Sequence, residues 1–287
     1  MRALVLGASG MLGSAVFWAF DKDASHEVWG LMRNESLFSY FSPIQRLRIL
    51  LGVDVLDEVS LCNAFERVRP DVVINCVGLI KQKIHTEDPL AVLPINAMLP
   101  HQLAAFCVPR NIRLIQISTD CVFSGRKGMY TEAESSDAED LYGKSKYIGE
   151  LRDHKNAVTL RTSIVGRELN TSRALIDWFL AQHGVVHGFR RSIFSGITTL
   201  ELAHVIRDVI LPNAQLHGLY HISSAPISKF ELLTLVATEY QKIIEVLPDD
   251  QLVIDRSLDS TRFYKATGYL APTWKSMLRT MHTEEKY

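Results

Sequence analysis

The sequence predicts an α/β fold built on a doubly wound parallel sheet, and three observations lead to this prediction. Short apolar runs with little polar alternation recur through the first half, as in strands buried on both faces of a sheet. Helical patterns separate these runs, and such alternation is typical of parallel sheets with right-handed crossovers. A glycine-rich segment also follows the first apolar run and opens the first helix.

The expected strands and helices follow from the hydrophobic pattern along the chain. In order, the strands are expected at 3–6, 27–32, 72–75, 114–118 and 158–161. Helices of the first half are expected at 11–20, 61–67 and 100–107. The second half is less regular, with helical patterns at 174–183, 200–211, 229–240 and 274–281. No clean linker divides the chain, so we expect the second half to pack directly on the first.

Length and composition limit the class of protein. The chain has 287 residues, of which 47% are hydrophobic and 22% are charged, as in folded globular proteins. The 31 basic and 32 acidic residues leave a net charge of -1, which argues against a nucleic-acid binder or a membrane-surface protein. We find neither a signal peptide nor an apolar run of about 18 residues, so we expect a cytoplasmic protein without a membrane span.

No metal site is predicted from the cysteines and histidines. The four cysteines are spaced singly, without the Cys-x-x-Cys pairs of zinc sites or a disulfide framework. His183 and His187 are four residues apart, but Gly184 lies between them and no acidic ligand is close in sequence. Cys121 has no histidine partner nearby, so we interpret it as a buried thiol rather than a nucleophile.

The glycine-rich segment predicts a dinucleotide site. Glycine adopts unusual backbone angles, and its missing side chain lets the backbone approach a pyrophosphate. Free N–H groups at the start of the helix would then hold the anion. The segment is Gly7-Ala8-Ser9-Gly10-Met11-Leu12-Gly13, and we expect Gly7, Ser9, Gly10, Met11, Leu12 and Gly13 to contact the cofactor. Its place in the first strand-to-helix turn indicates a Rossmann-type fold; a tight turn without ligand is the weaker alternative.

Arg33 points to the choice of cofactor. It lies twenty residues after Gly13, where NAD-binding folds usually carry an acidic residue that binds the ribose 2′-hydroxyl. A guanidinium pairs instead with the oxygens of a 2′-phosphate, so we favour NADP(H) over NAD(H). An ordinary surface arginine is the alternative. Farther along, Asp54 and Val55 are candidate adenine contacts, although Asp54 is equally well explained as a loop acid.

Tyr142 and Lys146 are candidate catalytic residues, because a spacing of four places them on the same face of a helix. A nearby ammonium lowers the pKa of a phenol, which would let Tyr142 exchange a proton with a carbonyl or alcohol near neutral pH. Lys146 would also reach the nicotinamide ribose. Thr119, at the end of an expected strand, would hold the substrate oxygen beside the phenol. The coincidence of these residues with the glycine turn makes this common spacing meaningful.

Several segments resemble extended short-chain dehydrogenases/reductases, and more narrowly the dTDP-4-dehydrorhamnose reductase family. They are 6–13, 117–125, 142–150 and 160–166, with 194–203 and 258–262 also familial. The resemblance implies a catalytic triad of Thr119, Tyr142 and Lys146. It also implies NADPH-dependent reduction of the 4-keto group of a nucleotide-diphosphate-linked 6-deoxy sugar for surface polysaccharide synthesis. Related enzymes are often homodimers.

The resemblance further implies a division of the chain and a set of binding residues. Residues 1–167 and 196–222 would form the Rossmann domain, and 168–195 and 223–287 a smaller, irregular C-terminal region that binds the sugar nucleotide. Further cofactor contacts are expected at Asn75, Cys76 and Val77. Substrate contacts are expected at Lys81, Thr119, Val122, Phe123, Arg190 and Arg262. For Arg190 and Arg262, as for Arg173, binding the diphosphate and surface pairing are equally plausible; for Phe263 and Trp274, a core role is favoured over base stacking.

Two departures from the family leave the sugar and the reaction open. The segment Asn75–Lys83 differs from the family's Asn-Ala-Ala-Ala-Tyr-Thr, and Lys81 and Lys83 either meet phosphates or are solvated. Cys121 replaces the usual tyrosine and also the glutamate of related 4,6-dehydratases, which disfavours a dehydratase. The alternatives are an epimerase that retains NAD and a non-catalytic regulatory subunit, such as that of methionine adenosyltransferase.

Overall fold

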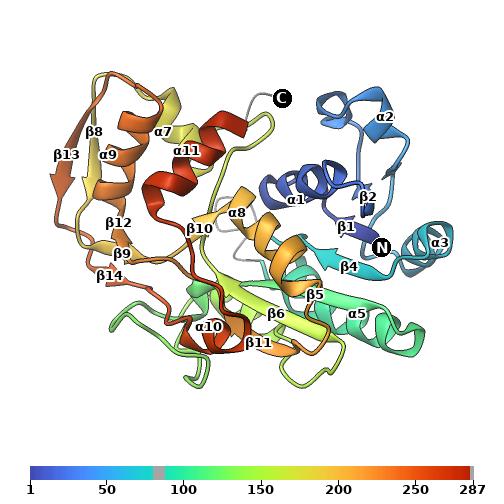
Figure 1. Cartoon of the computed structure of the whole chain (residues 1–287). Coiled ribbons are helices and arrows are strands. Elements are labelled where there is room, and N and C mark those ends of the chain that lie inside the picture. The colour runs from blue at the N-terminus through green and yellow to red at the C-terminus, as the bar shows by residue number, and fades with distance from the viewer. Residues whose placement is uncertain (80–87, 285–287) are drawn as a thin grey trace.

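Seven parallel strands form the central sheet of the protein, which we describe from a computed structural model covering residues 1–79 and 88–284. The strand order is β11-β6-β5-β4-β1-β2-β3 (Figure 1). Six of these strands follow the order 3-2-1-4-5-6 of dinucleotide-binding folds, which confirms the predicted fold class. Lys81 and Lys83, the suggested phosphate contacts, lie outside the described residues.

The strands of the sheet are short and mostly buried. They are β1 (Arg2–Leu6), β2 (Glu27–Met32), β3 (Ile49–Leu51), β4 (Val72–Asn75), β5 (Arg113–Thr119), β6 (Ala157–Thr162) and β11 (Gly218–His221). All five strands expected from the sequence are confirmed. The two additional strands, β3 and β11, have only three and four residues, which is too short for a clear hydrophobic pattern.

Helices cover both faces of the sheet, because alternate residues of each strand point to opposite sides. The main ones are α1 (Met11–Asp21), α3 (Glu58–Val68), α5 (Leu99–Cys107), α6 (Leu141–Ile148) and α8 (Thr199–His204). In β1, Ala3 and Val5 share a core with α1 and α8. Leu4 and Leu6 of the same strand share a second core with α3 and α5 on the other face. The sheet is therefore doubly wound, as predicted.

The C-terminal elements form a smaller group beside the sheet, on the left in Figure 1. They are α7 (Leu175–Ala181), β8 (Val185–Phe189), β9 (Ser192–Phe194), β12 (Ile227–Ser228), α9 (Lys229–Glu239), β13 (Glu245–Asp249) and β14 (Ile254–Asp255). Strand β8 pairs with β13, and β9 lies between β12 and β14. The intervening segment 196–222 returns to the main sheet through α8 and β11.

Short elements complete the described chain. They are η1 (Phe38–Tyr40), α2 (Pro43–Arg46), α4 (Pro89–Leu93), η2 (Pro94–Met98), η3 (Val108–Arg110), η4 (Asp120–Val122), β7 (Ile164–Val165), β10 (Ile197–Thr198), η5 (Val205–Ile210), α10 (Thr261–Thr267) and α11 (Trp274–Glu284). Most expected helices agree with the structure within three residues at each end. The exception is 200–211, which is α-helical only to His204 and continues as a π-helix, η5. Phe263 and Trp274 are buried, as their predicted core role requires.

One helical stretch corrects the expectation about apolar segments. Residues Pro89–Arg110 are long and apolar enough, by length and composition alone, to cross a bilayer. However, 44% of the apolar window is buried inside the protein, and Leu99, Leu103 and Cys107 pack in the core beneath the sheet. One face of the stretch thus packs in the core, and core helices can meet the same length and composition criteria.

Candidate active site

The predicted site residues gather at the carboxyl ends of three adjacent strands. Gly7 follows β1, Cys76 follows β4, and Thr119 ends β5. The strand order reverses between β1 and β4, and open parallel sheets bind ligands at such a point. The topology therefore brings together motifs that are far apart in the sequence.

The glycine turn is shaped for a ligand that approaches the backbone. Gly7 has a φ of 77°, a left-handed conformation that glycine adopts without steric cost. A Cβ atom on Gly13 would lie 2.1 Å from the carbonyl oxygen of Gly7, so α1 can pack against the turn only with glycine there. Helix α1 starts after Gly10, which has no side chain to cap the helix. The N–H groups of its first turn are therefore available to bind an anion. These residues fit a dinucleotide pyrophosphate. Of the other predicted contacts, Ser9 and Met11 are partly exposed and Leu12 is buried.

Arg33 and Asp54 lie on the β2–β3 side of the same sheet edge. Arg33 directly follows β2 and is exposed, a position that suits both a 2′-phosphate contact and a surface arginine. Asp54 is exposed too, but its Oδ1 accepts a hydrogen bond of 3.0 Å from the backbone N–H of Leu56. Asp54 therefore stabilises the turn before α3, as a loop acid does. Val55 is half-buried against the core.

Thr119, Tyr142 and Lys146 lie together at the end of β5. Tyr142 and Lys146 are one turn apart on α6, and the hydroxyl of Thr119 lies close enough to Tyr142 to affect the pKa of its phenol. Lys146 Nζ donates to the carbonyl oxygen of Ile117 at 2.7 Å, two residues before Thr119. Thr119 Oγ1 also accepts from the backbone N–H of Cys121 at 3.1 Å. The three predicted catalytic groups thus form one constellation.

The protonation of Tyr142 differs from the prediction made from the sequence. Burial raises the pKa of the phenol above its usual value near 10; the neighbouring Cys121 adds to the rise, and the hydrogen bond with Thr119 opposes it. The predicted lowering of this pKa by Lys146 is therefore wrong, because desolvation of the phenolate dominates. Tyr142 keeps its proton at neutral pH, so it is suited to donate one.

The pKa of Lys146 is shifted in the opposite direction to that of Tyr142. Burial lowers the pKa of its ammonium to about 8, while the charges of Glu150 and Cys76 oppose that change. Most Lys146 side chains are therefore protonated at pH 7. The Cys76 thiol also stays protonated, because burial raises its pKa to about 12. The ammonium of Lys146 consequently has no thiolate partner at neutral pH.

The loop after β4 passes this ammonium. A Cβ atom on Gly78 would lie 3.9 Å from Lys146 Nζ. Asn75 is fully buried: its Nδ2 donates to Gln116 Oε1 at 2.8 Å, and its Oδ1 accepts from the N–H of Val77 at 3.1 Å. The side chain of Asn75 therefore shapes the loop from inside the sheet, and of the three predicted contacts here only Cys76 and Val77 are partly exposed.

Asn96 belongs to the site but was not predicted from the sequence. It lies in the π-helical turn η2, where its Oδ1 accepts from the N–H of Leu79 at 2.9 Å. Its Nδ2 donates to the carbonyl oxygen of Leu79 at 3.0 Å and to Ser145 Oγ at 3.3 Å. Asn96 thereby fixes the loop after β4 against α6, next to Lys146. Single π-helical turns are frequent at functional sites, but nothing in the local pattern revealed this one.

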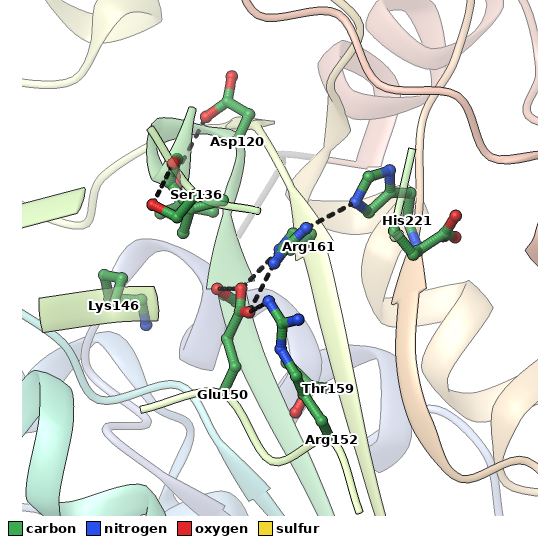
Figure 2. A network of polar contacts seen from close by, with 12 residues as sticks. Asp120, Ser136, Lys146, Glu150, Arg152, Thr159, Arg161 and His221 are labelled. Atoms are coloured by element: carbon green, nitrogen blue, oxygen red, sulfur yellow. Dashed lines mark hydrogen bonds and ion pairs between the residues drawn. The ribbon is translucent and has the colours of Figure 1, made fainter. Parts of the chain in front are cut away.

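A buried ionic network lies behind the triad (Figure 2). Glu150 accepts from Arg161 Nε at 2.6 Å and from Arg161 Nη2 at 2.7 Å, and both side chains are fully buried. Ser118 Oγ, next to Thr119 on β5, donates to Glu150 Oε1 at 2.8 Å. Arg152 adds a further contact of 2.9 Å to Glu150 Oε2. The network therefore joins the end of β5 to β6 and to the segment after α6.

His221 extends the network toward the C-terminal segments. Its Nε2 lies 3.2 Å from Arg161 Nη1 and must accept, because a guanidinium only donates. Nδ1 therefore carries the proton, and it faces the carbonyl oxygens of Tyr130 at 3.1 Å and Asp259 at 3.2 Å. Burial and the Arg161 charge lower the pKa of His221 to about 3, which agrees with a neutral ring.

Four of the predicted substrate contacts are buried or engage other side chains of the protein. Val122 and Phe123 are fully buried, and Phe123 stacks on Tyr130 at 4.1 Å between ring centroids, which rules out their side chains as ligand contacts. Arg190 is exposed and forms a two-point ion pair with Asp250. The guanidinium of Arg262 lies over the Tyr220 ring at 4.9 Å.

Comparison with known proteins identifies the family. The sequence profile described as "RmlD substrate binding domain" matches residues 1–285. The chain belongs to this RmlD family. Membership makes it an extended short-chain dehydrogenase/reductase, as the sequence motifs predicted.

Two curated relatives of the RmlD-family chain have different printed roles. A "Probable low-salt glycan biosynthesis reductase Agl14" of Haloferax volcanii is 32% identical over 269 residues, which cover 90% of this chain and 84% of the relative. The "Methionine adenosyltransferase 2 subunit beta" of Danio rerio is 27% identical over 268 residues, covering 88% of this chain and 76% of the relative. The match to the corresponding Xenopus tropicalis and rat subunits covers only 47% and 48% of their length.

Solved structures share the whole fold. A dTDP-4-dehydrorhamnose reductase from Bacillus anthracis in complex with NADP has a TM-score of 0.79 and 19% identity, and 99% of each chain is covered. WbmG of Bordetella bronchiseptica in complex with NAD has the same TM-score and identity, covering 99% of this chain and 93% of the other. At these identities the likeness concerns the fold, and both dinucleotides are found on it.

Proposed function

We propose that this RmlD-family chain reduces the 4-keto group of a nucleotide-diphosphate-linked 6-deoxy sugar, with NADPH as hydride donor. Membership of the family supports the coarser assignment of a sugar-nucleotide reductase. The observation that carries the finer proposal is the meeting of Thr119, Tyr142 and Lys146 beside the glycine turn. The glycan biosynthesis reductase among the relatives supports a role in surface polysaccharide synthesis, which we expect to take place in the cytoplasm.

Each residue of the site has a separate role in the proposed reaction. A bound NADPH supplies a hydride to C4 of the sugar. Tyr142 gives its hydroxyl proton to the keto oxygen, so the hydride and the proton together convert the ketone to an alcohol. Thr119, whose hydroxyl lies close to Tyr142, holds the same oxygen in place. Lys146 presents its ammonium to the nicotinamide ribose, and Asn96 keeps the neighbouring loop in position.

The preference for NADPH rests on Arg33. Its guanidinium is exposed at the carboxyl end of β2, beside the glycine turn, and can pair with a 2′-phosphate. Arg33→Ala should lower the affinity for NADPH about tenfold or more and leave NADH binding unchanged, as measured by quenching of tryptophan fluorescence. Equal binding of both cofactors to the wild type would remove the preference from the proposal.

The remaining parts of the proposal concern the architecture. We assign the sugar nucleotide to the C-terminal region, 168–195 and 223–287, facing the Rossmann domain. We also propose a homodimer through α4, η2, α5 and α6, which pack together. These elements carry the exposed apolar side chains of Leu90, Met98 and Ile148. Apolar patches of this kind are typical of interfaces between subunits.

The decisive test is oxidation of NADPH with a panel of 4-keto-sugar nucleotides, followed by absorbance. Tyr142→Phe should lower kcat by about 100-fold or more, because the proton donor is lost, while NADPH still binds. Tyr147→Phe is the matched control, since Tyr147 lies on the same helix and its ring stacks against Arg152. If no ketone in the panel is reduced by the wild-type chain, the proposed reaction is wrong.

The methionine adenosyltransferase β subunits among the relatives favour a second candidate, a nucleotide-binding regulatory subunit. This role predicts that NADPH binds without turnover and that the chain co-purifies with a larger enzyme. An NAD-retaining epimerase would instead release NAD on denaturation, as an absorbance spectrum of the supernatant would show. Full turnover of NADPH by the isolated chain contradicts both.

A further inference from the structure

Two cations of the C-terminal region approach the end of β5 and have no role in the reaction described above. Arg256 directly follows β14, and Lys229 is the first residue of α9. Both side chains are partly buried. Within residues 1–79 and 88–284, neither forms a salt bridge with a carboxylate. Cations that are partly desolvated without an ion-pair partner indicate a binding site for an anion.

Arg256 is held beside the loop that follows Thr119. Its Nε donates to the carbonyl oxygen of Phe123 at 2.8 Å, and its Nη1 lies 3.8 Å from Cys121 Sγ. A guanidinium has five N–H donors, so these two contacts leave three for a ligand. The backbone N–H of Arg256 donates to the carbonyl oxygen of Ile193 at 2.9 Å, which fixes the residue from the other side.

The segment that carries Arg256 is joined tightly to the loop that follows Thr119. The N–H of Asp255 donates to the carbonyl oxygen of Gly125 at 2.7 Å. Gly125 has a φ of 88°, and a Cβ atom there would lie 2.3 Å from Ile254 Cγ1 and 3.0 Å from Arg256 Cγ. The guanidinium is therefore positioned by packing and backbone hydrogen bonds together, as a preorganised binding group should be.

Lys229 lies beside Arg256 across β9, because Ser228 before it pairs with Ile193, whose carbonyl oxygen accepts from the N–H of Arg256. Burial lowers the pKa of its ammonium, Cys121 and Asp120 oppose that change, and the charge of Arg256 adds to it. The nearest acid along the helix, Glu231, is engaged elsewhere: it accepts from Ser228 Oγ at 2.8 Å in the capping box of α9. Glu231 therefore does not neutralise Lys229.

Cys121 connects these cations to the triad. Its Sγ lies 3.8 Å from Arg256 Nη1, and Cys121 also raises the pKa of Tyr142. Among the described residues, both cations act on the buried carboxyl of Asp120, whose pKa the Arg256 charge lowers, so one carboxyl faces two cations here. By contrast, the predicted Arg190 is already paired with Asp250 at the surface.

We propose that Arg256 and Lys229 bind the diphosphate of the sugar nucleotide. In a pyranose the diphosphate on C1 lies across the ring from the keto group on C4, and Arg256 contacts Phe123 and Cys121 of the loop that follows Thr119. A charged, planar donor and a point charge together suit a diphosphate with several negative oxygens. The identity of the ligand rests on the proposed function.

The inference can be tested without catalysis, by calorimetric titration of the NADP-saturated chain with dTDP, UDP and GDP. The nucleoside diphosphate that binds best should lose about tenfold or more in affinity in Arg256→Met and in Lys229→Met, whereas its nucleoside should bind all variants equally. Arg256→Lys should retain part of the affinity. Arg190→Met is the matched control and should behave as the wild type, since Arg190 is exposed and paired.

NADPH titration of each variant reports whether the Rossmann domain is intact. Unchanged affinity for the diphosphate in both Met variants overturns the inference, as does a wild-type chain that binds none of the three diphosphates. If binding depends on Arg256 and Lys229 but no ketone is reduced, the inference stands and the proposed reaction fails. If a ketone is reduced but the two variants leave diphosphate binding unchanged, the proposed reaction stands and the inference fails.

Discussion

Replacement of Arg161 by methionine should be among the most destabilising single changes in this protein. Arg161 is fully buried and donates to both carboxylate oxygens of Glu150 and to His221 Nε2. Arg161→Met keeps an apolar chain of similar length but removes these donors. The carboxylate of Glu150 would then remain buried, with Ser118 and the partly exposed Arg152 as its remaining partners.

The magnitude follows from the burial of this ion pair. Removing one partner of a buried, hydrogen-bonded pair typically costs about 3–5 kcal/mol in the free energy of unfolding. For a chain of this size that corresponds to a decrease of roughly 10 °C in Tm. Removing both charges leaves no uncompensated buried carboxylate, so Glu150→Leu combined with Arg161→Met should be more stable than Arg161→Met alone.

Urea unfolding followed by tryptophan fluorescence measures these differences. The matched control is Arg126→Met, because Arg126 pairs with Glu139 at the surface with side chains 74% and 72% exposed. Its loss should cost less than about 1 kcal/mol. The reasoning is refuted if Arg161→Met is no more destabilising than Arg126→Met, or if the double variant is as unstable as the two single changes added together.

Three further predictions concern protonation and the glycine turn. Burial lowers the pKa of His221 to about 3, so between that value and about 6.5 the unfolded chain binds the extra proton and stability falls as the pH falls. From pH 7 to pH 5 this loss is about 2 kcal/mol, and urea unfolding should show a smaller loss for His221→Gln; an equal loss would contradict it. Lys146, with a pKa of about 8, should lose its charge at higher pH, so that NADPH binding weakens above pH 8. Glu150→Gln removes a charge that raises this pKa and should move the decrease to lower pH; a move to higher pH would show that the sign is wrong. Gly13→Ala would place a Cβ atom 2.1 Å from the carbonyl oxygen of Gly7, so NADPH affinity in a fluorescence titration should drop by at least about tenfold. An unchanged affinity would argue against the glycine turn as the pyrophosphate site.

Much of the candidate site was predictable because its signals are local. The left-handed Gly7 and the closely packed Gly13 belong to one short turn, and only glycine fits there. Tyr142 and Lys146 share a helix face through their spacing alone. Thr119 ends a strand whose apolar residues predict burial, and the carboxyl ends of parallel strands lie at the same edge of a sheet.

Other parts of the site depend on contacts between distant segments. Arg256 and Cys121 are 135 residues apart, and Asn96 and Ser145 are 49 apart, so no local pattern reports either contact. The sequence left diphosphate binding and surface pairing of Arg190 equally open, and the structure pairs it with Asp250, 60 residues away. Charged and polar side chains find their partners only after the loops are placed, and the hydrophobic pattern does not encode that placement.

The sequence by itself determined the doubly wound sheet, the dinucleotide turn and the positions of Thr119, Tyr142 and Lys146, because burial of strands and backbone geometry depend on neighbouring residues. Only the tertiary structure decided the protonation of those groups and the cations that face them. Tyr142 illustrates the reason. A spacing of four from Lys146 predicted a lowered pKa, but the pKa of a side chain depends on all the atoms that exclude water from it, and here that burial outweighs the nearby charge.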